Sequence, residues 1–382
     1  MSDKFDDIAP LYDYEVEQAI QDILVDPGFQ HAVKYILPEI DWDEFSAEMS
    51  KYKTKKQFQT AMIYPVVKAM GMRVSSSIKS ENWENIDRSV EHLFLSNHRD
   101  IVLDAGLFNI LRHEQGLETT EIAIGDNLLI HPWIDKLVRL NKSFLVKRGL
   151  SVKERLVASK HMSEYIHYAI NEKKESVWIA QREGRAKNSD DRTQDSLLKM
   201  LALYPDNKSF LESLREMNLI PLSISYEYDP CDYLKAKEFQ QKRDDPEFKK
   251  SQRDDLLNME IGILGKKGNV MFRLGKCINP GLDKITEPDK RIQAELAANI
   301  IDKEIHSNYE IFPCNYIAYD LFYKTDRFNG KYTKEQSDSF NAYLEKQICK
   351  IDLDYIDHDF VLEKMLEMYS YTLKNYLEAI GQ

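Results

Sequence analysis

The chain has 382 residues, of which 43% are hydrophobic and 30% charged, and its formal net charge is −12. This ordinary globular mixture excludes a disordered or collagen-like chain, and the excess of acids argues against a protein built throughout to bind polyanions. No apolar stretch approaches the length of a membrane-spanning helix, and the acidic start is unlike a signal peptide. The four cysteines have no metal-binding spacing, which indicates a reducing compartment.

Residues 1–87 are predicted to form an N-terminal helical region. Apolar residues recur at helical spacing in Asp13–Leu24, in Phe29–Leu37 and in residues 53–73. The segment Ala61–Met72 is apolar enough to pack in a core or to contact a membrane surface. No chemistry is visible in this region, so we interpret it as a helical cap on the domain that follows.

Residues 88–280 alternate short apolar strands with helices, which predicts an α/β domain with a mixed, largely parallel sheet flanked by helices. The predicted strands are His92–Ser96, Glu121–Gly125, Ser143–Lys147, Ser176–Gln181 and Leu219–Tyr226. The predicted helices between them are Val102–Glu114, Pro132–Asn141, Ser151–Lys173 and Thr193–Leu203.

The rest of the chain is predicted to be a polar run, a hairpin and more helices. Gln240–Asp255 is interpreted as a solvated loop or an exposed helix. A β-hairpin is predicted from Glu260–Leu264, a glycine-flanked turn and Asn269–Leu274. Residues 281–382 are predicted to form a C-terminal helical region, with helices at 290–306 and 359–380.

A histidine stands directly after the first predicted strand of the α/β domain. His98 is followed by carboxylates two and six positions on, at Asp100 and Asp104. Ligands bind at the carboxyl ends of strands in α/β sheets. A histidine there can take a proton from a hydroxyl group, and a carboxylate can hold its tautomer. The alternative is a loop histidine that only contacts a nearby acid, and the local sequence does not decide between them.

Two basic segments follow later strands. Lys147 and Arg148 end one strand, where paired cations suit a phosphate, although a solvated strand end is the simpler interpretation of this segment alone. The next strand opens after Gln181 into a loop that contains Gly184 and four basic residues and runs to a predicted helix near Thr193. Fixed cations and the free backbone N–H groups of a helix start together favour an anion site.

Positive charge concentrates in residues 136–187, which hold 13 Lys or Arg and 5 Asp or Glu. We therefore expect an anionic ligand in this part of the chain. Nucleic acid is not expected, because no set of stacking aromatic residues is interleaved with the cations. A fourth block is an apolar strand that begins near Pro221 and ends in Tyr226 and Glu227, and alone it indicates only a core strand.

In sequence order, these four blocks resemble the four motifs of the glycerol-phosphate acyltransferase superfamily, which includes the lysophosphatidate acyltransferases. The family's first motif is a histidine after a strand followed by an aspartate, as at His98. Phe144–Arg148 is similar to the second motif, Glu183–Ala186 to the third, and the strand with Pro221 to the fourth. The resemblance covers about residues 90–275.

Two departures from the family pattern indicate a divergent branch. The family places its aspartate five residues after the histidine, where this chain has Leu103. Asp100 comes three residues too early and Asp104 one residue too late. We favour Asp104, because its gap differs less and because it falls in the first turns of a predicted helix. The third motif is also one residue short, between its glycine and its arginine.

The resemblance implies transfer of a fatty acyl group from a thioester, on CoA or acyl carrier protein, to a hydroxyl of glycerol-3-phosphate or 1-acyl-glycerol-3-phosphate in phospholipid synthesis. His98 would act as the general base, oriented by Asp104 or Asp100. The other residues implied to bind substrate are Arg148 and Arg185 with Lys147 and Lys187 for the phosphate, Glu183 and Gly184 for the acceptor site, and Pro221 for the acyl side.

The resemblance implies no cofactor beyond the thioester co-substrate. No metal is expected, because histidines and cysteines do not cluster at ligand spacing. An acyl-chain substrate implies contact with a membrane surface, so we expect a cytoplasmic protein that lies peripherally on the inner face of the membrane. Two alternatives stay open: an acyltransferase for a hydroxylated lipid without phosphate, and a non-catalytic lipid-binding protein on the same fold.

Overall fold

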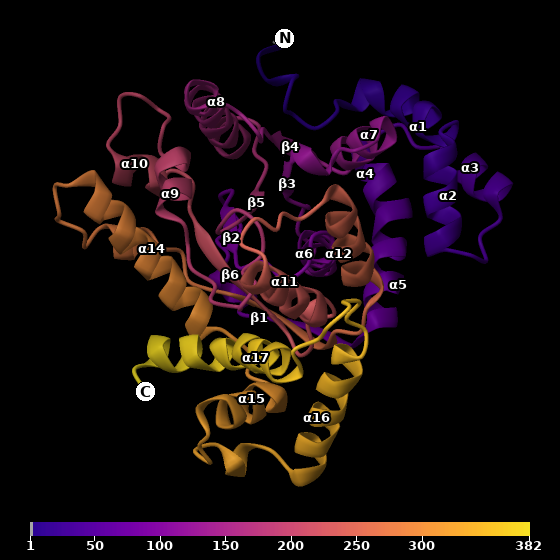
Figure 1. The fold of residues 1–382 in the computed structure, drawn as a ribbon. Helices are drawn as coiled ribbons and strands as arrows, with labels where there is room; N and C mark the ends of the chain where they lie inside the picture. Colours follow the sequence, from indigo (N-terminus) through magenta and orange to yellow (C-terminus); the bar gives the residue numbers. More distant parts are fainter. Residues whose placement is uncertain (1–2) are drawn as a thin grey trace.

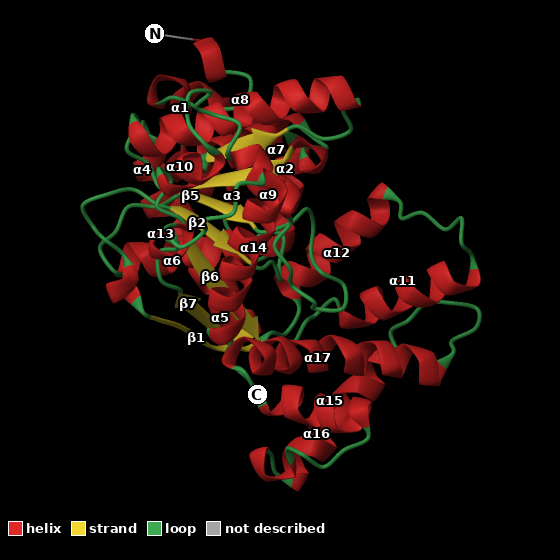
Figure 2. Ribbon diagram, turned by 90° about the vertical axis from the view of Figure 1, so that its left-hand side faces the viewer, coloured by secondary structure: helices red, strands yellow, loops and turns green. Residues whose placement is uncertain are grey.

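The computed structural model describes residues 3–382, in which a seven-stranded sheet lies between helices on both faces (Figures 1 and 2). The spatial order is β1-β7-β6-β2-β5-β3-β4, and every neighbouring pair is parallel except β6 and β7. The strands are β1 (Ser75–Glu81), β2 (Leu93–Ser96), β3 (Glu121–Gly125), β4 (Ser143–Val146), β5 (Val177–Ala180), β6 (Ile220–Tyr226) and β7 (Gly268–Leu274).

Helices make up most of the rest of the described chain. The helices before β4 are α1 (Val16–Leu24), α2 (Pro27–Ile36), α3 (Trp42–Met49), α4 (Lys55–Phe58), a π-helical turn η3 (Gln59–Ile63), α5 (Tyr64–Val74), α6 (Leu103–Glu114) and α7 (Pro132–Leu140). Those between β4 and β7 are α8 (Val152–Asn171), α9 (Asp195–Leu201), α10 (Phe210–Arg215), α11 (Asp232–Asp244) and α12 (Gln252–Leu264). The last are α13 (Asn279–Leu282), α14 (Lys290–Ser307), α15 (Pro313–Tyr323), α16 (Lys334–Ile348) and α17 (His358–Ile380).

The central strands are buried on both faces, which explains why they are short apolar runs without alternation. All four residues of β2 are buried, and β2 pairs in parallel with β5 on one side and β6 on the other. One core packs α6 against the sheet around Phe108, and a second packs α8, α9 and α14 against the opposite face around Ile166. The sheet is therefore the middle layer of three.

Two further helical clusters extend the domain. An N-terminal core joins α1, α2 and α3 with α7 around Ile20 and Phe45. A C-terminal core joins α11, α15, α16 and α17 around Phe340 and Met365. Figure 1 shows the N-terminal helices beside α7 and the C-terminal group beneath the β1 side of the sheet.

The structure confirms the α/β class, and all five strands predicted in residues 88–226 are present within one or two residues of their predicted limits. The predicted hairpin is wrong, because Glu260–Leu264 is the end of α12. Ser251 caps that helix in a reciprocal arrangement with Asp254, and apolar residues continue at helical spacing. Asn269–Leu274 belongs to β7, which pairs with β1 and β6 instead.

One strand was missed. β1 lies inside the segment 1–87 that was predicted to be helical, so the sheet begins before residue 88. Its sequence, SSSIKSE, is mostly polar because β1 is an edge strand with a partly exposed surface. The neighbouring segment Ala61–Met72 packs partly against α6, where Gly71 contacts Leu107, and leaves other residues exposed.

Candidate active site

The loop after β2 is tied to the neighbouring strand β6 by a buried asparagine. The Asn97 side chain donates a hydrogen bond to the Ile224 carbonyl oxygen at 2.9 Å and accepts one from the Ile224 N–H at 2.8 Å. Asn97 is fully buried, so these two bonds extend the β2–β6 pairing past the end of β2. The next residue, His98, is thereby held at the carboxyl edge of the sheet.

His98 and Asp104 form a hydrogen-bonded pair. Asp104 Oδ2 lies 2.8 Å from His98 Nδ1 and also accepts the backbone N–H groups of Arg99 and Asp100, at 2.6 and 3.0 Å. Asp104 is fully buried in the first turn of α6. Because an ionised carboxylate only accepts, Nδ1 of His98 carries the hydrogen, and Nε2 keeps its lone pair for another partner.

Asp100 has a different set of partners. Its Oδ1 accepts the backbone N–H groups of Val102 and Leu103, at 2.9 and 2.8 Å, and so caps the start of α6. Its Oδ2 lies 3.6 Å from the ammonium of Lys267, which is fully buried. The structure therefore brings Asp104 to the histidine ring and uses Asp100 to cap the helix and pair with a buried cation.

A second buried network fixes the loop that follows β5. Arg99 pairs with Asp191 at 2.8 Å, and Tyr309 donates a hydrogen bond to the same carboxylate at 2.7 Å. Asp302, on α14, accepts the Thr193 N–H at 2.8 Å. These contacts link the loop that carries His98, the loop after β5 and the C-terminal helices, so that each segment holds the others in position.

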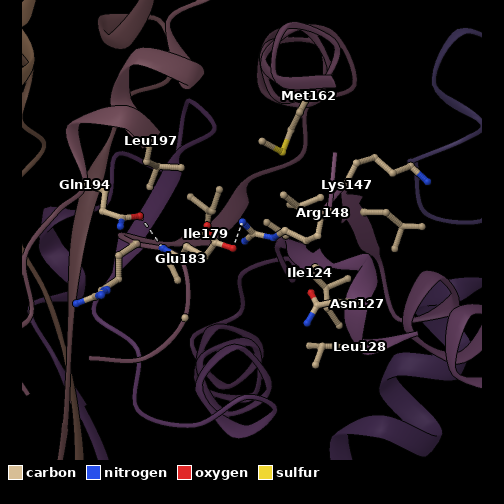
Figure 3. A pocket seen from close by; sticks show the side chains of 18 of the residues that line it. Ile124, Asn127, Leu128, Lys147, Arg148, Met162, Ile179, Glu183, Gln194 and Leu197 are labelled. Atoms are coloured by element: carbon tan, nitrogen blue, oxygen red, sulfur yellow. Dashed lines mark hydrogen bonds and ion pairs between the residues drawn. The ribbon is translucent and has the colours of Figure 1, made fainter. Parts of the chain in front are cut away.

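A cleft of about 1710 Å³ opens beside His98 at the ends of β3, β4 and β5. One wall is apolar and comes from these strands and from α8 and α9, with Ile124, Ile179, Met162 and Leu197 among its residues (Figure 3). Trp178 also lines the cleft, and its ring meets the His98 ring edge to face, with 5.9 Å between centroids. The histidine thus stands where a polar edge meets an apolar cavity.

Arg148 and Arg185 come from different loops and line this same cleft. Arg148 forms an ion pair with Glu183 at 2.9 Å, and Figure 3 shows the two side chains pointing toward each other. Asp126 accepts the Arg148 N–H at 2.9 Å, and Gln194 accepts the Glu183 N–H at 2.9 Å. The loop after β4 and the loop after β5 are therefore each held by a side chain that accepts a backbone N–H group.

Arg185 is half-buried and lies beside a cysteine. Its Nη1 is 3.8 Å from Cys231 Sγ. Burial raises the pKa of the Cys231 thiol to about 11, so this thiol stays protonated near neutral pH and is a poor nucleophile. In the described chain, Arg185 has no carboxylate within ion-pair distance, which leaves its guanidinium available to an anion.

Comparison with known families identifies this part of the chain. Residues 77–225 match the family model described as Acyltransferase, a stretch that begins in β1 and ends in β6. The chain carries an acyltransferase domain. The matched stretch contains His98, Asp104, Arg148 and Arg185, and the match agrees with the predicted resemblance to an acyltransferase family over this part of the chain.

The solved structures that match the chain include an acyltransferase. The 1-acyl-sn-glycerophosphate (LPA) acyltransferase PlsC from Thermotoga maritima is 11% identical, with a TM-score of 0.36. The similarity covers 76% of this chain and 97% of that one. No curated protein sequence matches the chain.

The remaining predicted residues of the acyltransferase domain fall into three groups. Gly184 lines the cleft with a φ of +67°, a left-handed conformation that favours glycine. Lys187 lines the cleft but is ion-paired with Glu238 of α11. Lys147 also lines the cleft but is exposed, and in Figure 3 its side chain extends away from Arg148.

Pro221 does not line the acyl side of the cleft, contrary to what the resemblance implied. It is buried in the middle of the sheet, opposite Leu95 of β2, and its carbonyl oxygen accepts the Gly275 N–H at 2.7 Å. Its place in β6 makes it a structural residue of the acyltransferase domain.

The motifs left some residues of the site unassigned. Trp178 was predicted only as part of a strand, and its contact with His98 depends on the pairing of β2 with β5. Arg182 lines the cleft, and its Nε is buried without a hydrogen-bond partner in the described chain. Its position next to the Glu-Gly-Arg motif was the signal that could have identified it.

Two further features are absent from the residues that the structure describes. Within residues 3–382, no group of three or more His, Cys, Asp or Glu side chains is arranged to hold a metal ion. Over the same residues, no helix combines the length and the apolar character needed to cross a bilayer.

Proposed function

We propose that the protein transfers a fatty acyl group from a thioester, carried by CoA or acyl carrier protein, to a hydroxyl of glycerol-3-phosphate or 1-acyl-glycerol-3-phosphate in phospholipid synthesis. One observation carries the proposal: the His98–Asp104 pair stands at a cleft that two arginines, Arg148 and Arg185, also line. A base, a site for a phosphate and an apolar cavity are the three features that this reaction needs in one place.

The proton transfer follows from the tautomer of His98. Asp104 accepts the Nδ1 hydrogen, so Nε2 is the basic nitrogen and takes the proton of the acceptor hydroxyl. The imidazolium that forms is stabilised by the carboxylate next to it. A positioned general base of this kind contributes roughly 10²- to 10⁴-fold to the rate.

The bond changes need no covalent enzyme intermediate. As Nε2 removes the hydroxyl proton, the acceptor oxygen attacks the thioester carbonyl carbon and forms a new C–O bond. The tetrahedral intermediate then collapses, the C–S bond breaks and the electron pair leaves with sulfur. The proton held by His98 passes to the thiolate, which leaves as the thiol of CoA or acyl carrier protein.

The acceptor phosphate would lie between Arg148 and Arg185. Arg148 would exchange its ion pair with Glu183 for the phosphate, which offers more acceptor oxygens and more charge. Arg185 already lacks a carboxylate partner among the described residues. The acyl chain would lie against the apolar wall formed by β3, β4, β5, α8 and α9.

The test is direct. Purified protein is incubated with a long-chain acyl-CoA or with acyl carrier protein thioester, and with glycerol-3-phosphate, 1-acyl-glycerol-3-phosphate or a phosphate-free hydroxylated lipid. We expect thiol release and ester formation with a phosphate-bearing acceptor, and neither with the His98→Ala variant. Ester formation only with the phosphate-free acceptor, or none with any acceptor, would contradict the proposal.

One observation favours a second candidate, an acyltransferase for a hydroxylated lipid without phosphate. Arg148 and Lys187 each have a carboxylate partner, Glu183 and Glu238, so part of the positive charge at the cleft is already compensated. A neutral acceptor would leave these ion pairs in place. The same acceptor panel distinguishes the two candidates.

A further inference from the structure

The first two turns of α8 expose apolar side chains at the edge of the cleft. Val152, Leu156 and Val157 are 83%, 63% and 67% exposed, which places them among the most exposed large apolar side chains of the described chain. The helix has a complete N-terminal cap, in which Ser151 and Glu154 bond reciprocally, so these turns are ordered helix. Their exposure therefore does not result from a frayed end.

Positive charge flanks this apolar surface. Val152 and Leu156 are four residues apart and lie on one face of α8, with Lys153 on one side and Arg155 on the other. Residues 147–160 contain five Lys or Arg and a single acid, in a chain of net charge −12. An apolar stripe bordered by Lys and Arg is typical of a helix that lies in a membrane interface.

The surface adjoins the cleft. Lys153, Arg155 and Val157 line the cleft, whereas Val152 and Leu156 lie outside it. Figure 2 shows α8 extending to the same side of the molecule as α11 and α12, which contribute residues to the opposite rim. That opposite rim has mixed charge: Lys235 and Lys250 line the cleft there, and the first turn of α12 carries Asp254 and Asp255.

We propose that the first two turns of α8 dock the protein on an anionic lipid bilayer, with Val152, Leu156 and Val157 among the lipids and the flanking cations at the headgroups. The proposal rests on the proposed function only in explaining why a docking surface adjoins the cleft: a lipid acceptor or product could pass between bilayer and cleft. It replaces Ala61–Met72 as the membrane-contacting segment, since part of that segment packs against α6.

A bilayer fits this surface better than an acidic protein does. Cations alone would attract either partner, but the most exposed side chains here are apolar and gain most by entering the acyl boundary of a bilayer. Anionic lipids add an attraction for each Lys and Arg near the surface, and salt screens that attraction.

The test uses the full chain and vesicles of phosphatidylcholine, alone or mixed with phosphatidylglycerol, in a sedimentation assay. We expect binding to the anionic vesicles, weakened by salt, and little binding to phosphatidylcholine alone. The double variant Val152→Gln, Leu156→Gln removes the apolar stripe without changing the charge, keeps good helix formers and spares the cleft. We expect its vesicle binding to fall about tenfold or more.

The control is Val25→Gln, which removes a valine that is 82% exposed at the end of α1 and should leave vesicle binding unchanged. The proposal is overturned if the wild type ignores anionic vesicles or if the double variant binds like the wild type. It is also overturned if the double variant instead changes the oligomeric state or loses binding to acyl carrier protein.

Vesicle binding needs no catalysis, so its outcome is separate from that of the proposed function. With a water-soluble, short-chain thioester and glycerol-3-phosphate, the double variant should keep wild-type turnover. Vesicle binding without any acyl transfer would leave the docking surface standing and remove the proposed function. Acyl transfer without vesicle binding would remove the docking surface and leave the proposed function standing.

Discussion

Asp104 follows His98 by six residues, and its Oδ2 lies 2.8 Å from His98 Nδ1. The family spacing is one residue shorter, and the turn between the two residues accommodates the difference. Asp100 caps α6 inside that turn, so Asp104 falls in the first turn of the helix. Helical side chains point toward the N-terminus, which returns the Asp104 carboxylate to the loop that carries the histidine.

The first prediction concerns the base. His98→Ala should lower acyl transfer by roughly 10²- to 10⁴-fold, because no other group would take the hydroxyl proton. The variant should keep its thermal stability, since within residues 3–382 His98 donates only one hydrogen bond, to Asp104. Turnover is measured by thiol release, with His31→Ala as the control because His31 is exposed on α2. Near-normal turnover in His98→Ala would show that His98 is not the base.

The second prediction separates the two aspartates by two measurements. Asp104→Asn should lower the rate strongly, because an amide can favour the wrong histidine tautomer. Asp100→Asn should affect the rate less but lower the free energy of unfolding by about 3 kcal/mol, since it leaves Lys267 buried without its carboxylate. The measurements are turnover and chemical denaturation. A larger rate loss in Asp100→Asn would move the orienting role to that residue.

The third prediction concerns the acceptor phosphate. Arg148→Ala and Arg185→Ala should each raise the acceptor KM, because a charge-assisted hydrogen bond contributes on the order of 1.5 to 3 kcal/mol. The thioester KM should change little. Arg185→Lys should restore only part of the affinity, since an ammonium cannot bind a phosphate through two parallel bonds.

Lys147→Ala is the matched control for these arginines, because Lys147 is adjacent to Arg148 but points away from it. It should leave the acceptor KM unchanged. If the arginine variants weaken thioester and acceptor binding equally, or if Lys147→Ala has the same effect, the phosphate site is not where we propose it.

The fourth prediction concerns stability and pH. Burial lowers the pKa of His167, on α8, from 6.5 to about 4. The unfolded chain therefore binds a proton more readily than the folded protein between these values, and the stability contribution of the neutral histidine is lost as pH falls from 6.5 to 4. The shift corresponds to about 3 kcal/mol.

His167→Gln provides the comparison, because a glutamine amide can donate to Ser213 as the ring Nε2–H does. Between pH 7 and 4, the free energy of unfolding should fall by about 3 kcal/mol more in the wild type than in the variant. Denaturation curves at several pH values measure this difference, in which the contributions of other groups cancel. Parallel pH profiles would contradict the assigned pKa.

The amino-acid sequence by itself determined most of the α/β architecture. Central strands such as β2 and β5 are buried on both faces, so they stand out as apolar runs between polar loops. The alternation of apolar strands and polar loops also placed His98, Arg148 and Arg185 after strands. Their residue types alone then identified them as candidate site residues. This reasoning failed for β1, whose partly exposed edge position allows a polar sequence, and for Glu260–Leu264, where a short apolar run does not distinguish helix from strand.

Only the tertiary structure decided how the candidates are used. Spacing left Asp100 and Asp104 as alternatives, and the start of α6 assigned Asp104 to the histidine and Asp100 to Lys267. Lys147 and Arg148 are adjacent in the sequence and both line the cleft, but Arg148 is ion-paired with Glu183 and Lys147 is exposed and extends away from Arg148. Pairing partners such as Lys267 and Trp178 come from distant segments, and no local pattern encodes which segments a sheet will bring together.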